Sequence, residues 1–272
     1  MNMSLGDGLE FSTARIEANS GSVGTGFFLF FRMDEDISIP VLVTNKHVVE
    51  GASEIRFQIS GTGNGLDRAA ILVDNVQERF IFHPDEDVDL CAFPIAPVLK
   101  QLKERGFEFN IFPFHEDIIF TNKNNKLGTI SAIQEIHMTG YPNGLWDEVN
   151  NKPITRKGVT ASNPKLWWQG KNRFMIDMAC FPGSSGSPVY IYKEGAHIDG
   201  DSIALGNRLV LLGILFAGPQ LTANGDIQIV EVPTDYKYMV STNLMMNLGI
   251  VIKADELFII KKMIIDSEPY HK

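Results

Sequence analysis

Two adjacent serines, Ser184 and Ser185, lie in a short segment of turn-forming residues, and either hydroxyl could act as a nucleophile. The segment 181–188 reads Phe-Pro-Gly-Ser-Ser-Gly-Ser-Pro. A serine hydroxyl is a weak nucleophile at neutral pH, so it needs a nearby base and donors for an oxyanion. A turn built on Gly183 and Gly186 could direct the N–H groups of Gly183 and Ser185 to one point beside the Ser185 hydroxyl. By itself, the segment is equally typical of a plain turn between strands.

A histidine and an aspartate upstream supply the groups that a serine nucleophile needs. His47 follows the apolar run 41–43, and Asp89 directly precedes the apolar run 90–93. The order is therefore His47, Asp89, Ser185, with gaps of 42 (89 − 47) and 96 (185 − 89) residues. Among the chain orders known for such triads, only the His–Asp–Ser order fits. An α/β-hydrolase would need the order Ser–Asp–His and a Gly-x-Ser-x-Gly elbow, which Ser187 interrupts.

These three motifs resemble those of the trypsin-like serine proteases of the chymotrypsin fold. The similar subgroup is that of the bacterial HtrA/Deg-like peptidase domains, here without a PDZ domain. Residues 24–27, Gly-Thr-Gly-Phe, are similar to their Gly-Ser-Gly-Phe element, and residues 177–188 are similar to Asp-Ala-Ala-x-x-Pro-Gly-Asn-Ser-Gly-Gly-Pro. Two positions depart from the pattern. Ser187 replaces a glycine, and Ser184 stands where digestive trypsins have an aspartate that pairs with a new N-terminus, so activation by N-terminal cleavage is not expected.

The resemblance implies a role for each of these groups in a serine endopeptidase. His47 takes the Ser185 proton, Asp89 orients the imidazole, and the N–H groups of Gly183 and Ser185 form the oxyanion hole. Asp87 is the alternative acid because it lies two residues earlier in the same extended segment. Asp89 is preferred because it directly precedes the buried strand.

The resemblance also predicts which residues shape the substrate pocket. They are Ala179, Cys180 and Phe181 before the nucleophile, and Phe216, Ala217 and Gly218 on the strand after it. None of them is acidic, and a basic side chain left unpaired in a pocket would be costly. The nearest acid, Asp177, matches the aspartate of the HtrA-like element. We therefore predict cleavage after small or medium apolar P1 residues.

A second function, from another class, stays open at this stage. A protease-fold binding or scaffold module would keep the fold with little or no turnover. Such a module usually lacks a triad residue, whereas His47, Asp89 and Ser185 are all present. A probe that reacts with active-site serines would separate the two functions.

Composition predicts an ordinary globular protein whose partner is a protein or peptide substrate. Of 272 residues, 44% are hydrophobic, and the net charge of −9 disfavours nucleic acid or an anionic membrane as a partner. The only cysteines, Cys91 and Cys180, lie among apolar residues and are predicted to be buried thiols. The histidines show no metal-ligand spacing, so no metal or cofactor is predicted. The N-terminal residues lack a signal-peptide pattern, which predicts a cytoplasmic location. The oligomeric state is not predicted.

The pattern of short strands predicts an all-β fold with two antiparallel six-stranded Greek-key barrels and a C-terminal α-helix. The expected units are a first barrel carrying His47 and Asp89 (1–108), a linker (109–127), a second barrel carrying Ser185 (128–250), and a helix with a tail (251–272). A helical pattern covers 97–105, and a second one, 255–266, is expected to begin at an Asp255 N-cap and to pack on the second barrel. The expected strands are 11–16, 26–31, 41–44, 54–59, 69–73, 79–82, 90–93, 130–137, 158–161, 174–178, 189–192, 209–216 and 227–232.

Overall fold

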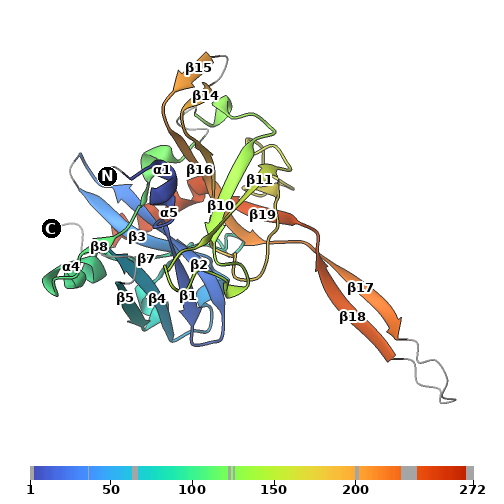
Figure 1. Cartoon of the computed structure of the whole chain (residues 1–272), viewed down its shortest axis with the longest axis horizontal. Coiled ribbons are helices and arrows are strands. Elements are labelled where there is room, and N and C mark those ends of the chain that lie inside the picture. The colour runs from blue at the N-terminus through green and yellow to red at the C-terminus, as the bar shows by residue number, and fades with distance from the viewer. Residues whose placement is uncertain are drawn as a thin grey trace.

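The computed structural model describes residues 3–35, 37–62, 67–121, 124, 126–199, 202–227 and 238–267. Two β-structures divide the chain, and the predicted all-β architecture with a C-terminal helix is confirmed (Figure 1). The predicted strand 227–232 lies outside the described residues beyond Ile227, as does His271. No helix in the described ranges is long and apolar enough to cross a membrane.

The first half forms a nine-stranded open sheet and not the predicted closed six-stranded barrel, because the strands at the two ends of its main path each pair with a single neighbour in the described chain. Its main path runs β5-β4-β1-β2-β3-β7-β6, with β8 added to β4 and β9 added to β2. The strands are β1 (Thr13–Ala18), β2 (Val23–Arg32), β3 (Ser38–Thr44), β4 (Glu54–Gly61), β5 (Arg68–Asp74), β6 (Ile81–Phe82), β7 (Cys91–Pro94), β8 (Phe109–Asn110) and β9 (Phe114–His115). β8 and β9 come from the predicted linker, so the beginning of that segment belongs to the sheet.

The second half forms a closed six-stranded barrel, as predicted, in the order β10-β11-β12-β19-β16-β13. Its strands are β10 (Glu135–Gly140), β11 (Ile154–Thr160), β12 (Arg173–Asp177), β13 (Pro188–Lys193), β16 (Arg208–Ala217) and β19 (Leu248–Lys253). Two hairpins extend from it: β14 (Ala196–Asp199) with β15 (Ser202–Leu205), and β17 (Gln220–Ile227) with β18 (Tyr238–Met245). In Figure 1 the second hairpin points away from both sheets.

Three predicted strands begin at least two residues later than expected, and the first of them, predicted at 11–16, starts at Thr13. The strand predicted at 79–82 starts only at Ile81, because 76–79 form a helical turn. The strand predicted at 130–137 starts at Glu135. At Gln134 one backbone bond persists, from the Thr160 N–H to the Gln134 carbonyl, while the Thr160 hydroxyl accepts the Gln134 N–H and donates to the Ala132 carbonyl.

Helices are short and few in the described chain. They are α1 (Leu5–Leu9), α2 (Lys46–Val49), α3 (Val76–Arg79), α4 (Ala96–Glu104) and α5 (Leu257–Asp266), with 3-10 turns η1 (Glu116–Ile118), η2 (Leu127–Thr129), η3 (Pro142–Gly144) and η4 (Ala254–Glu256). α4 and α5 match the two predicted helices. The Asp255 N-cap is wrong, because η4 precedes α5 and the Asp255 carboxylate accepts a hydrogen bond from Asn172 instead.

One hydrophobic cluster joins the two halves. It combines Phe27 and Phe31 from the first sheet with Ile214 and Ile252 from the second barrel. The buried face of α5, formed by Leu257, Ile260 and Ile264, enters the same cluster. The helix therefore packs against both halves and not only against the second barrel. Two further clusters are present, one in the interior of the first half and one in the interior of the second.

Candidate active site

His47 lies on a single helical turn at the end of a buried strand. β3 is buried over its last four residues, and α2 follows it after Asn45. Val48 and Val49 are 1% and 0% exposed and fix the turn to the core. Since these two valines face inward, the His47 side chain remains 43% exposed at the surface.

Asp89 holds His47 through both of its carboxylate oxygens. Oδ1 accepts the backbone N–H of His47 at 3.1 Å, and Oδ2 is hydrogen-bonded to Nδ1 of the ring. The Asn45 side chain donates to the main-chain carbonyl of Asp89 at 2.6 Å. Because an ionised carboxylate only accepts hydrogen bonds, Nδ1 of the neutral imidazole carries the proton and Nε2 is left as an acceptor. This is the tautomer that a general base needs.

Asp87, the alternative acid, points to a different partner. Its carboxylate forms an ion pair with Lys171 at 2.8 Å, and this hydrogen bond lowers the pKa of the Asp87 carboxyl. The segment before β7 consists of turns, so the alternation of side chains along a strand does not apply there. The structure therefore places Asp89 and not Asp87 beside His47.

Ser185 lies on a tight turn that leads into β13. Gly183 and Gly186 have φ of +83° and +88°, which residues with a Cβ rarely adopt. A Cβ at Gly183 would lie 2.5 Å from the Tyr141 carbonyl oxygen, and one at Gly186 would lie 2.0 Å from the Thr25 carbonyl oxygen. Both positions therefore require glycine, for conformation and for space.

The hydrogen bonds of this turn leave two of its N–H groups free. The N–H groups of Ser184, Gly186 and Ser187 donate to the carbonyls of Phe181, Leu215 and Ser184 at 2.8–3.1 Å. Those of Gly183 and Ser185 have no acceptor among the described residues. These are the two groups that the sequence predicts as the oxyanion hole.

Thr25 of β2 holds the serine turn against the first sheet. Its N–H donates to the Ser185 carbonyl at 2.8 Å, and its hydroxyl donates to the Gly183 carbonyl at 2.9 Å. The same hydroxyl accepts the Tyr141 N–H at 3.1 Å. The Thr44 hydroxyl donates to the Thr25 carbonyl at 2.8 Å. Sequence reasoning used Thr25 only as part of a motif, and nothing in its local pattern indicates that it bridges the two halves.

The turn after β10 supports the serine loop from the other side. Asn143 donates its N–H to the Pro182 carbonyl at 2.5 Å. The Tyr141 side chain is buried and donates to the Thr13 carbonyl at 3.3 Å, and burial raises the pKa of its hydroxyl to about 12. The sequence indicates an aromatic turn at 140–146 but not its contact with this loop.

The Ser185 turn and the His47 turn meet at Gly186. A Cβ at Gly186 would lie 2.7 Å from the Thr44 hydroxyl, so the residue after Ser185 packs near the end of the strand that leads to His47. Within the described chain, no hydrogen bond joins the Ser185 hydroxyl to the His47 ring. The two side chains line separate cavities that share no residue. In free enzymes such catalytic hydrogen bonds are often long and shorten when substrate binds.

A small apolar cavity of about 140 Å³ opens beside Ser185. It is lined by Cys180, Phe181, Pro182, Ser185, Leu215, Phe216, Ala217 and Gly218. Five of the six predicted pocket residues are in this set. Ala179 is not, because its carbonyl accepts a hydrogen bond from the Arg156 guanidinium, which also lies 4.7 Å from the Phe181 ring. Asp177 is exposed at the end of β12 and does not line the cavity.

Both cysteines are buried free thiols, as predicted. Burial raises the pKa of Cys91 well above its usual value and that of Cys180 to about 12. Because only a thiolate is a good nucleophile or metal ligand, these thiols are inert at neutral pH. Among the described residues, no cluster of histidine, cysteine or carboxylate side chains is arranged to hold a metal ion.

Fold and site together define a trypsin-like serine protease. The family model of the trypsin-like peptidase domain matches residues 24–198, more than half of the chain and a range that includes His47, Asp89 and Ser185. The chain belongs to this family and is a serine endopeptidase. No curated protein sequence shows significant similarity to it.

Solved structures of distant proteases align over nearly the whole chain. An inactive mutant form of Rv3671c from M. tuberculosis H37Rv has 15% identity and a TM-score of 0.46, covering 98% of this chain and 93% of its own. A serine endoprotease from Yersinia pestis has 16% identity and a TM-score of 0.47, covering 94% and 64%. The MamO protease domain from Magnetospirillum magneticum has 13% identity and a TM-score of 0.43, covering 93% and 97%.

Proposed function

We propose that this serine endopeptidase cleaves peptide bonds with His47, Asp89 and Ser185 as its catalytic triad. The observation that carries the proposal is that the Asp89 carboxylate is hydrogen-bonded to both the backbone N–H and the ring Nδ1 of His47. That arrangement leaves Nε2 as the basic nitrogen of the ring.

In the first step, Nε2 of His47 removes the proton of the Ser185 hydroxyl while Oγ attacks the substrate carbonyl carbon. The carbonyl oxygen becomes an oxyanion that the Gly183 and Ser185 N–H groups bind, and Asp89 stabilises the imidazolium. When the C–N bond breaks, the imidazolium gives its proton to the leaving amine. Water then attacks the acyl-enzyme, with His47 again as the base, and releases the acid and free Ser185.

The cavity beside Ser185 supports a small or medium apolar P1 residue such as Val, Ala or Leu. Its volume of about 140 Å³ is below the roughly 300–1,000 Å³ of sites that hold whole ligands, so it suits one side chain. No charged residue lines it, and the nearby cation Arg156 would repel a basic P1 residue. Neighbouring apolar residues that differ by one methylene should be distinguished only about 10–200-fold.

The triad is tested with a fluorophosphonate probe that labels activated serines. We expect labelling of the native chain and of Ser184→Ala but not of Ser185→Ala, because Ser185 lines the cavity whereas the Ser184 side chain is buried. Ser184 is the matched control, since it is the adjacent serine and its side chain is buried. Labelling that persists in Ser185→Ala would overturn the assignment. A native chain that is never labelled would favour the alternative, a binding module with little or no turnover.

The pocket assignment is tested by profiling cleavage of a peptide library that varies only at P1. We expect the highest kcat/KM for small and medium apolar residues. A clear preference for Arg or Lys would contradict the assignment, because no acid lines the cavity to pair with such a charge.

A further inference from the structure

A second cavity shares no lining residue with the pocket beside Ser185 or with the cavity that contains His47 and Asp89. It has a volume of about 770 Å³ and is formed between the edge strand β5 and helix α4. Its lining is Ala69, Ala70, Ile71, Leu72, Val73, Arg79, Val98, Gln101, Leu102, Arg105 and Phe107. We refer to it as the β5–α4 groove.

One wall of the groove is the main chain of an unpaired sheet edge. Five consecutive residues of β5, 69–73, line it, which means that backbone as well as side chains faces the cavity. β5 is the last strand on its side of the first sheet, and β4 is its only partner in the described chain. The outer edge of β5 therefore offers N–H and C=O groups to an added strand.

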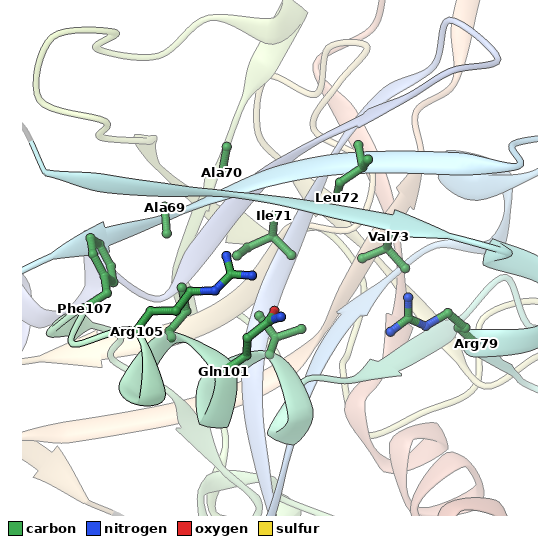
Figure 2. A pocket seen from close by; sticks show the side chains of 11 residues that line it. Ala69, Ala70, Ile71, Leu72, Val73, Arg79, Gln101, Arg105 and Phe107 are labelled. Carbon is green, nitrogen blue, oxygen red and sulfur yellow. The ribbon is translucent and has the colours of Figure 1, made fainter.

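The other wall is one face of helix α4, on which aliphatic and polar side chains alternate. Val98, Gln101, Leu102 and Arg105 follow the spacing of one helical face, and the aliphatic side chains pack on the interior cluster of the first sheet. Figure 2 shows β5 crossing above this helix, with the Gln101 and Arg105 side chains directed toward Ile71. The helix side of the groove therefore offers two aliphatic side chains, Val98 and Leu102, and two polar ones, Gln101 and Arg105.

The charges of the groove have one sign. Arg79 and Arg105 are its only ionisable lining residues, although the chain as a whole carries a net charge of −9. In Figure 2, Arg105 lies toward the Phe107 end and Arg79 toward the Val73 end. Arg79 is held in place by Asp74 at 2.8 Å and by the Phe93 ring at 5.4 Å, whereas Arg105 forms no ion pair with any described residue.

From these features we propose that the β5–α4 groove binds an extended acidic peptide segment of a partner protein. The segment adds to β5 as a further strand, which satisfies the main-chain groups of the edge. Its central apolar side chains pack on Ile71, Val98 and Leu102, and a carboxylate near one end pairs with Arg105, which has no ion-pair partner among the described residues. A neutral or basic segment would leave the Arg105 charge unpaired. The site is a second substrate contact or a regulatory contact, separate from the catalytic groups.

The test measures peptide binding in the full chain with Ser185→Ala, so that it does not depend on turnover or on the triad assignment. The probe is a fluorescein-labelled peptide, Glu-Glu-Val-Leu-Val-Glu-Glu, and the readout is fluorescence anisotropy. We expect saturable binding that Arg105→Glu weakens by about tenfold or more. The control is Lys100→Glu, which makes the same charge change on α4 outside the lining and should leave the Kd within about twofold.

Two altered peptides separate the contributions of charge and backbone. Replacing every Glu by Lys should abolish binding, and N-methylating the three central amides should do the same, because strand addition needs those donors. Equal weakening by Arg105→Glu and Lys100→Glu would overturn the proposal, as would full binding of the N-methylated peptide or no binding of the probe. Thermal unfolding checks that the variants are folded, and Arg105→Gln replaces Arg105→Glu if the latter is not.

Discussion

The two halves of the active site are held in place by different kinds of interaction. On the first sheet, Asp89 positions His47 through side-chain contacts at a partly exposed surface. On the second barrel, glycine conformations and backbone hydrogen bonds shape the Ser185 turn. We therefore expect that deleting a side chain disables the first half without changing the fold, whereas adding one methyl group to a glycine of the Ser185 turn deforms the second half.

The largest expected effects come from deleting the reacting side chains. Ser185→Ala and His47→Ala should each lower kcat by about 10⁶, while Asp89→Asn should lower it by about 10⁴ because the imidazole loses its orientation and tautomer. Steady-state kinetics on a peptide substrate measures all three. Asp87→Asn is the control and should leave kcat near the native value, since Asp87 pairs with Lys171. A large loss in Asp87→Asn would contradict the assignment of the acid.

A smaller loss of kcat is expected when a Cβ is added to a glycine of the Ser185 turn. Gly183→Ala would place a methyl group 2.5 Å from the Tyr141 carbonyl oxygen and shift the oxyanion N–H groups, so kcat should fall by about 10²–10³. Gly195→Ala is the matched control because Gly195 has φ of +81° and open space around it. Gly195→Ala should lower the stability of the fold, as measured by thermal unfolding, and leave kcat unchanged. Equal kcat in the two variants would show that the turn tolerates the change.

Removing the Thr25 hydroxyl, which links the two halves, should have an effect of intermediate size on stability and kcat. Thr25→Val removes the hydroxyl that donates to the Gly183 carbonyl and leaves the buried Tyr141 N–H without its acceptor. We expect a loss of about 1–3 kcal/mol in the free energy of unfolding and about a tenfold lower kcat. Thr25→Ser keeps the hydroxyl and should retain most of both. If Val and Ser variants behave alike, the methyl packing of Thr25 matters and its hydrogen bonds do not.

The smallest expected effect is on stability, and it comes from the ion pairs that Glu135 forms across the strands of the closed barrel. Glu135 of β10 pairs with Lys157 of β11 and Lys193 of β13, and these hydrogen bonds lower its pKa to about 2. Since the folded-state pKa is depressed, the pairing stabilises the fold above about pH 4.5, and the contribution is lost as pH falls from there toward 2.

The matching variant is Glu135→Gln. Because these side chains are partly exposed, it should lower the free energy of unfolding at pH 7 by less than about 1 kcal/mol, with a smaller difference at acidic pH. Urea unfolding at both pH values measures this, with Glu104→Gln on α4 as the control. A difference that grows at low pH would contradict the sign of the pKa shift.

Much of the fold was predictable because it follows from local patterns. Apolar runs ending at His47 and beginning after Asp89 mark β3 and β7, and the apolar spacing of residues 257, 260 and 264 marks α5. The start of β10 was not predictable, because a side-chain hydroxyl 26 residues away accepts the Gln134 N–H in place of a main-chain carbonyl. The α5 cap was missed for the same reason, since a distant Asn172 engages Asp255.

The sequence alone determined the residues able to do the chemistry, since Gly183, Ser185 and Gly186 carry their conformational demands in their own types and spacing. Only the tertiary structure decided between Asp89 and Asp87, because the choice depends on where His47 and Lys171 lie in space. It also decided which N–H groups stay free and that Thr25 joins the halves. These contacts link residues from 42 positions apart, for His47 and Asp89, to 158 positions apart, for Thr25 and Gly183, and no local pattern records which partner a hydrogen bond will find.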